Sequence, residues 1–222
     1  MAGVFPIVNQ ARSESAVLAR RFYDENRFNH NHRDPYDLNL PDYEWEWFLE
    51  AMEPSYKDFA RVVTTDGQFA QTGLRAVKEV ENGGRRMMLN AVRNDPVRVG
   101  WARVATGRET CAFCLMLVSR GPVYERSEDV GISDEEKALE ILDDGADQAA
   151  LKELMTRWHP GCDCIAVPVY DIDSWEGRED WKRAEDIWKD TTKGFTGRDK
   201  LNAFRRAIDN GTVNPQDFAV AA

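Results

Sequence analysis

The chain has 222 residues, of which 42% are hydrophobic and 31% are charged, a composition typical of a soluble globular protein with one or two domains. No stretch approaches the roughly 18 consecutive apolar residues that a membrane span requires, so we expect no membrane contact. The formal net charge of −10 argues against direct binding to nucleic acid, because phosphate backbones are bound by basic surfaces.

Residues 1–95 are predicted to form helices. Apolar side chains recur near helical spacing over 9–26, and the polar segment 26–41 predicts a loop because it contains two prolines. Asp42 is expected to cap a second helix, which is rich in aromatic residues and is interrupted at Pro54. The N-terminal region is therefore predicted to be a helical arm.

A third helix is predicted over 66–94, where apolar residues again follow the helical period. Gly83 and Gly84 are adjacent within this stretch. Because glycine is a poor helix former, we expect the pair to break or bend the helix.

Short strands are predicted in the region 96–172. Residues 97–105 alternate between apolar and polar side chains, which predicts a half-buried strand. Residues 123–124 are expected to begin a short strand, and 165–170 form another that Pro168 places at an edge or an end. Further helices are predicted over 133–155, 175–189 and 200–210, and residues 211–222 are expected to form a tail.

All four cysteines and one of the three histidines lie in two short clusters: Cys111 and Cys114, then His159, Cys162 and Cys164. Two thiols three positions apart can bind one ion from a single turn, and the second cluster repeats this spacing. Tetrahedral zinc needs four such ligands and five are present, so either Cys164 or His159 is outside the ligand set. The spacing does not choose between them.

The separation of the two clusters predicts a metal ion that clasps two distant segments, at two strand ends, and does not fold a finger alone. The predicted fold class is accordingly α+β and mostly helical. It comprises a helical N-terminal region (1–95), a small mixed domain with a few short strands clasped by the Cys/His site (96–172), and a helical C-terminal extension with its tail (173–222).

Two other roles for the cysteines compete with zinc. In an oxidising compartment the four thiols would form two disulfides, but the N-terminus does not look like a signal peptide. A redox CxxC motif usually opens a helix after a strand and works alone, whereas here a second cluster follows. A structural metal site is therefore favoured.

The segments 105–124 (ATGRETCAFCLMLVSRGPVY) and 158–164 (WHPGCDC) resemble the Mu F-like minor head proteins of tailed bacteriophages, of the type found in phages of actinobacteria. The resemblance covers about residues 97–170. It implies a virion protein, made in the host cytoplasm and present in few copies in the phage head, and we expect this protein to be non-enzymatic. The implied partners are the portal, the scaffold or the major capsid protein, and the implied role is head morphogenesis or genome delivery.

A capsid maturation protease is the alternative function. It would use Ser119 as nucleophile, His159 as base, and Asp163 or Asp171 to orient the histidine. A histidine that binds metal is not available as a base, which weakens this reading. A zinc hydrolase is also disfavoured, because thiolate-rich sites with four or five protein ligands leave no open position for water.

Overall fold

The computed structural model of the protein describes residues 1–38, 42–59, 66–97, 99–106, 110–124 and 158–218. The chain forms two compact units, an N-terminal one of residues 1–97 with 158–161 and a C-terminal one that holds the remaining described residues. The predicted α+β class, mostly helical, is confirmed. The division at residues 95 and 172 stays a prediction, and the helices expected over 133–155 lie outside the described residues.

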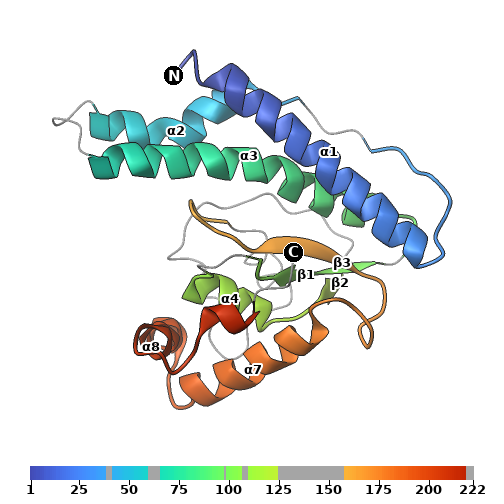
Figure 1. Cartoon of the computed structure of the whole chain (residues 1–222), viewed down its shortest axis with the longest axis vertical. Helices are drawn as coiled ribbons and strands as arrows, with labels where there is room; N and C mark the ends of the chain where they lie inside the picture. The colour runs from blue at the N-terminus through green and yellow to red at the C-terminus, as the bar shows by residue number, and fades with distance from the viewer. Residues whose placement is uncertain (39–41, 60–65, 98, 107–109, 125–157, 219–222) are drawn as a thin grey trace. The chain divides into compact units, whose positions relative to one another are not determined.

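The described part of the N-terminal unit contains three helices: α1 (Phe5–Asn29), α2 (Trp45–Phe59) and α3 (Asp66–Asn94). Helices α1 and α3 lie side by side along most of their length, and α2 packs against the first part of α3 (Figure 1). Helix α1 begins earlier than the apolar pattern predicts, because a proline in its first turn suits a helix start. An apolar core forms where Val8 of α1 meets Phe48 and Met52 of α2.

Polar side chains fix the α1–α3 contact. The carboxylate of Asp95, which follows α3, accepts hydrogen bonds from the Tyr23 hydroxyl at 2.7 Å and from Nε of Arg27 at 2.8 Å. Nearer the start of α1, Nη1 of Arg12 donates to the Glu79 carbonyl at 2.6 Å. All of these side chains are buried, so each charge has a partner where water is excluded.

The predicted break at Pro54 and the predicted break at Gly83 and Gly84 are wrong, whereas a bend at the two glycines stays a prediction. Helix α2 runs without a break through Pro54, and α3 runs through Gly83 and Gly84. The glycines instead permit close helix packing, because a Cβ atom on Gly83 would lie 2.1 Å from the carbonyl oxygen of Arg12. The amide of Gly84 donates to Ser15 Oγ at 3.1 Å across the same contact.

The C-terminal unit contains strands β1 (Gly100–Val104), β2 (Val123–Tyr124) and β3 (Ile165–Val169). They form an antiparallel sheet in the order β2-β1-β3, in which Trp101 is opposite both Val123 and Pro168. Pro168 therefore lies on an edge strand, as predicted, where its missing N–H breaks no ladder.

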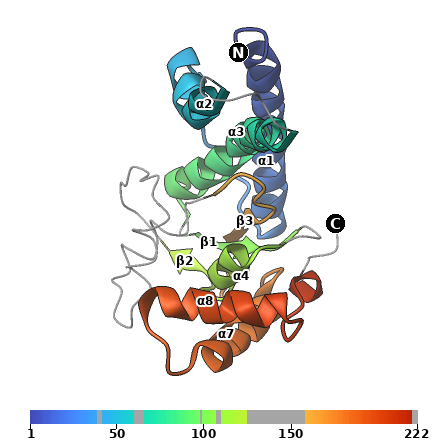
Figure 2. The same ribbon diagram turned by 90° about the vertical axis from the view of Figure 1, so that its left-hand side faces the viewer.

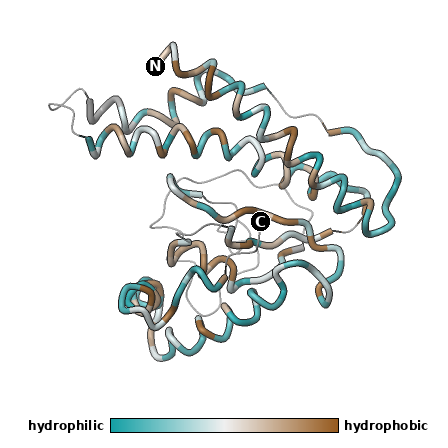
Figure 3. Tube along the Cα trace, viewed as in Figure 1, coloured by the Kyte–Doolittle hydropathy of each residue, from teal (hydrophilic) through white to brown (hydrophobic). Residues whose placement is uncertain are grey.

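In the described residues of this unit, the α-helices are α4 (Ala112–Val118), α7 (Arg178–Thr192) and α8 (Gly197–Asp209). Helix α4 lies between the sheet on one side and the α7–α8 pair on the other (Figure 2). Its seven residues are all buried. The apolar colour of α4 and β3 contrasts with the mostly hydrophilic α7 and α8 (Figure 3). Helix α4 is thus the centre of the core of this unit.

Two further predictions need correction. Strand β1 is buried along its whole length and not half-buried, because α4 covers one of its faces and even its charged residue is enclosed. The expected tail over 211–222 contains a 3₁₀ helix, η1 (Pro215–Phe218), and both Val213 and Phe218 are buried. Among the residues that the structure describes, no helix has the length and apolar content to cross a membrane.

Candidate metal centre

The first cysteine pair is positioned by the start of α4. Cys111 is the N-cap residue with an extended backbone, and its sulfur accepts the amide proton of Cys114 at 3.4 Å. Residues three apart at a helix start lie on one face, so both thiols point the same way. The pair therefore lies at a helix start and not at a strand end, which corrects that part of the expectation.

The second pair, Cys162 and Cys164, lies in the loop that leads into β3, and Cys164 directly precedes Ile165. Alternate residues of an extended segment place their side chains on the same side. The sulfurs of Cys162 and Cys164 are 3.4 Å apart. Each pair is therefore preorganised by its own local backbone.

The two pairs meet at the sulfur of Cys114, which lies 3.0 Å from that of Cys162 and 3.2 Å from that of Cys164. Cys114, Cys162 and Cys164 are buried, and Cys111 is partly exposed. All four cysteines are in the described part of the chain, and none of them forms a disulfide bond there. The sulfurs of Cys114, Cys162 and Cys164 thus lie within 4.8 Å of one another, and the sulfur of Cys111 adjoins this group through Cys114.

This cluster fits a tetrahedral thiolate site. With Zn–S bonds of about 2.3 Å, the sulfurs of such a site are about 3.8 Å apart. The observed distances of 3.0, 3.2 and 3.4 Å require only an outward movement of a few tenths of an ångström (~0.5 Å) to reach this geometry. The donor set is soft, which suits zinc better than magnesium or calcium.

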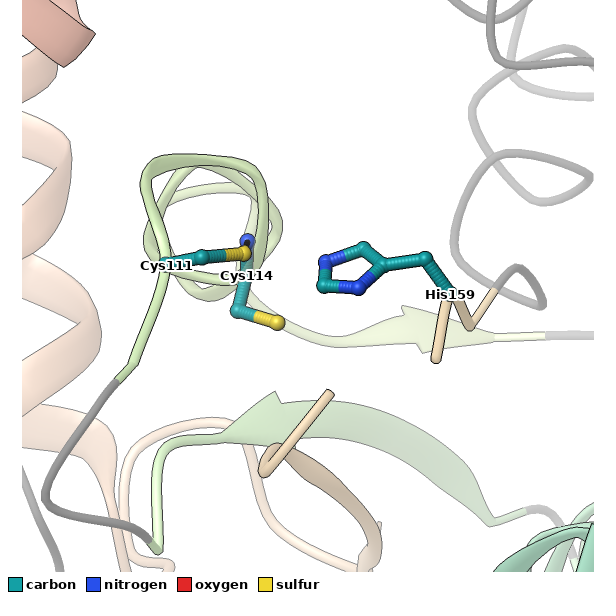
Figure 4. A group of neighbouring side chains, drawn as sticks. All are labelled: Cys111, Cys114 and His159. Carbon is teal, nitrogen blue, oxygen red and sulfur yellow. Dashed lines mark hydrogen bonds between the residues drawn. The ribbon is translucent and has the colours of Figure 1, made fainter. Parts of the chain in front are cut away.

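His159 is the fifth candidate ligand. Figure 4 draws it with Cys111 and Cys114, whose side chains lie side by side at the start of α4. Nδ1 of His159 is 2.9 Å from the carbonyl oxygen of Pro160. The segment 158–161 belongs to the N-terminal unit, whereas all four cysteines belong to the C-terminal unit. The assignment of His159 as a ligand stays a prediction.

Two threonines tie the loop before Cys111 to the loop that carries the second pair. The hydroxyl of Thr110 donates to the Asp163 carboxylate at 3.0 Å, and the hydroxyl of Thr106 donates to the Asp163 carbonyl. Burial raises the pKa of the Asp163 carboxyl, although the hydrogen bond from Thr110 acts against this shift. These bonds hold the two cysteine loops together without any ion.

A buried cation completes the site. Arg103 of β1 is fully buried, and its Nη1 donates to the sulfur of Cys164 at 2.9 Å. Hydrogen bonds from Cys114 and Cys162, together with the Arg103 guanidinium, lower the pKa of Cys164 well below its usual range. Hydrogen bonds to Cys111, Cys162 and Cys164 and burial raise the pKa of Cys114. The pKa of Cys164 and the pKa of Cys114 therefore shift in opposite directions, and binding of an ion requires each thiol ligand to lose its proton.

The cysteine spacing does not reveal the roles of Arg103, Thr110 and Asp163. Arg103 carries a signal of its own, because it follows Val99 and Trp101 on one face of the alternating segment. A charged residue at the end of an apolar face indicates a buried partner. The threonine contacts arise from loop geometry, for which the sequence offers no comparable sign.

The residues proposed for a protease are arranged less favourably. The hydroxyl of Ser119 is buried at the C-terminal end of α4 and donates to the Met116 carbonyl at 2.6 Å. Asp163 is engaged by the threonines described above. The nucleophile would first have to leave its carbonyl partner, so the geometry does not favour this alternative.

Comparisons with known proteins agree with a phage origin. The sequence matches the family model "VG15 protein" over residues 2–191. It is 37% identical over 242 residues to the Gene 15 protein of Mycobacterium phage D29, covering 99% of this chain and 88% of that protein. It is 35% identical over 250 residues to the Gene 15 protein of Mycobacterium phage L5, with 99% and 85% covered. No solved structure matches the chain. The chain therefore belongs to the VG15 protein family, a family of bacteriophage gene products.

Proposed function

We propose that the protein is a non-enzymatic minor component of the phage head, whose C-terminal unit is locked by a structural zinc ion. The observation that carries this proposal is the convergence of three buried thiols from two remote segments, with the sulfur of Cys111 within 4.8 Å of the sulfur of Cys114. A site saturated by four protein ligands offers no position for a reacting water, so it stabilises a fold and does not catalyse a reaction.

The residues that hold the ion are Cys111, Cys114, Cys162 and Cys164, which all come from the C-terminal unit. When bound, zinc supplies a cross-link between the start of α4 and the loop before β3. Structural zinc contributes about 10 kcal/mol or more of binding free energy in small zinc-finger peptides at neutral pH. The described part of this unit, in which a three-stranded sheet packs on α4, gains much from such a link.

Membership in a family of phage gene products and the resemblance to Mu F-like minor head proteins support a place in the head. The portal, the scaffold or the major capsid protein is the proposed partner. The net charge of −10 is consistent with contact to protein and not to packaged DNA.

The helical unit offers a surface for such a contact. Ile7, Leu18 and Phe22 of α1 are 69%, 66% and 39% exposed. At 100° per residue they fall within about 60° of one another on the helix, away from the buried Arg12 and Tyr23. Exposed apolar residues gathered on one helix face are typical of interaction surfaces.

Quantitative mass spectrometry of purified particles tests the proposal. We expect the protein in the particle at few copies relative to the major capsid protein. The combined change Ile7→Asp and Leu18→Asp, at exposed positions, should lower this copy number without lowering the melting temperature of the purified protein. Absence from particles, together with loss of head-protein cleavage when Ser119 is changed to alanine, would instead favour the protease.

A further inference from the structure

The side chain of Arg103 is enclosed completely, with 0% of its surface exposed. A guanidinium remains charged in every protein environment, so it cannot escape the cost of burial by losing its proton. Such a group persists in a core only where negative charge and hydrogen-bond acceptors surround it. The position of Arg103 in the sheet explains which acceptor its guanidinium contacts.

Strand pairing directs Arg103 to the cysteine cluster. Arg103 is opposite Ala166 in the β1–β3 ladder, and Ala166 is two residues beyond Cys164. Nη1 of Arg103 lies 2.9 Å from the sulfur of Cys164. A neutral thiol is a weak acceptor, whereas a thiolate forms a charge-assisted bond with a guanidinium. The contact therefore matches a negatively charged sulfur.

We propose that Arg103 is the positioning residue of the metal centre: it fixes the sulfur of Cys164 toward the ion and offsets the negative charge of the site. This inference rests on the zinc site in the proposed function. A divalent ion bound by four thiolates carries two net negative charges, and burying them is unfavourable. The guanidinium removes one of these charges inside the same enclosure, so it favours the metal-bound state.

Two substitutions separate charge from packing. Arg103→Lys keeps the positive charge on a shorter donor. Arg103→Met keeps much of the volume and removes both the charge and its desolvation cost, so a folded apo protein is expected. If Arg103 only fills space, the Arg103→Met variant should bind the metal as tightly as the Arg103→Lys variant does. If Arg103 offsets charge, the Arg103→Lys variant should bind the metal more tightly.

Arg120→Gln is the matched control. Arg120 belongs to the same unit, at the other end of α4, and its guanidinium packs over the Trp188 ring at 4.8 Å. Its removal deletes a largely enclosed guanidinium without changing the contact at Cys164. Any general loss of stability from deleting an arginine therefore appears in the control as well.

The experiment measures zinc affinity of the full chain by competition with a chromophoric chelator, and thiolate-to-metal charge transfer after loading with Co²⁺. Residues that form a hydrogen bond to a metal ligand typically contribute 10-fold to 100-fold to metal affinity. We expect Arg103→Met to bind zinc about 10-fold to 100-fold more weakly than wild type, with a weakened charge-transfer band. The zinc affinity of Arg103→Lys should lie between those of Arg103→Met and wild type. The zinc affinity of Arg120→Gln should equal that of wild type.

Equal zinc affinities for wild type, Arg103→Met and Arg103→Lys would overturn the role of Arg103 while leaving the metal site intact. Weaker binding by the Lys variant than by the Met variant would also overturn it. Failure of the wild-type chain to bind zinc or Co²⁺ is a different result, because it removes the metal site itself. If Arg103→Met does not fold, the comparison of Arg103→Lys with Arg120→Gln still decides: equal affinities contradict the proposal.

Discussion

The sulfur of Cys114 lies 3.0 Å from the sulfur of Cys162, although the two residues are 48 positions apart in the chain. This contact joins the start of α4 to the loop that leads into β3. Thiols are weak donors and weak acceptors, so a cluster of protonated thiols stabilises a fold very little. The same sulfur atoms bound to one ion form a strong cross-link. We therefore expect the contact to stabilise the fold when the ion is bound.

The change Cys114→Ser is expected to remove the zinc and to destabilise the C-terminal unit. Cys114 is the sulfur that touches both members of the second pair. The loss should be about 3 kcal/mol or more, since structural zinc supplies much of the folding free energy of small domains. Thermal unfolding with measurement of zinc content checks this. Ser119→Ala, at the C-cap of the same helix, should keep its zinc, and an unchanged melting temperature for Cys114→Ser would count against a structural ion.

Gly83→Ala is expected to destabilise the N-terminal unit by about 1–3 kcal/mol through overpacking. Its new Cβ atom would lie 2.1 Å from the Arg12 carbonyl oxygen, which is backbone and cannot move aside. Gly73→Ala in the same helix has no atom within 4 Å of its Cβ and should stabilise by up to about 1 kcal/mol. Denaturant unfolding of both variants measures the difference, and equal effects would refute the close helix contact.

The N-terminal unit is expected to lose stability at alkaline pH through Tyr36. Burial raises the pKa of Tyr36 to about 12, and its hydroxyl donates to the Ala91 carbonyl at 2.8 Å. The folded state therefore favours the protonated phenol. This contribution is fully present below the ordinary tyrosine pKa of about 10 and is lost as pH rises from there toward 12.

Stability at pH 9 and at pH 11 (roughly one unit either side of the ordinary tyrosine value) gives the measurement. Tyr36→Phe should show a smaller loss between these two values than the wild-type chain. It cannot form a phenolate, so it has no proton to lose in this range. An identical loss in both proteins would assign the alkaline effect to other groups.

Phe218→Ala is expected to destabilise the C-terminal unit by about 3–5 kcal/mol, the usual cost of deleting a buried phenyl ring. Phe218 is 2% exposed, and the Arg183 guanidinium packs over its ring at 4.4 Å. Phe195→Ala is the control, because that ring is 40% exposed. Calorimetric melting of the two variants distinguishes a packed C-terminal segment from a tail, for which both changes would be small.

Local sequence pattern predicted α1, α2, α3, α7, α8 and the edge strand, but it did not predict the short helix α4. The helical period predicted α3, and Pro168 predicted the edge position of β3. The predicted break at Gly83 and Gly84 is wrong for a tertiary reason. Glycine is a weak helix former, but Gly83 lies where another helix passes close by. The local sequence pattern contains no information about that neighbouring helix.

The candidate site shows the same limit. Two clusters of ligand residues indicate a metal by spacing alone, because soft ligands three apart have few other uses in combination. Spacing does not show that Arg103 lies at the sulfur of Cys164, since that depends on the register of β1 and β3. It also does not show how Thr110 and Asp163 join the two cysteine loops.

The most direct test of the central claim is the zinc content of the purified full chain, measured together with the reactivity of its thiols. The account predicts about one zinc per chain, as a single tetrahedral thiolate site requires, and thiols that react only after chelation. A chain without metal, whose four cysteines react at once under native conditions, would contradict the structural zinc site.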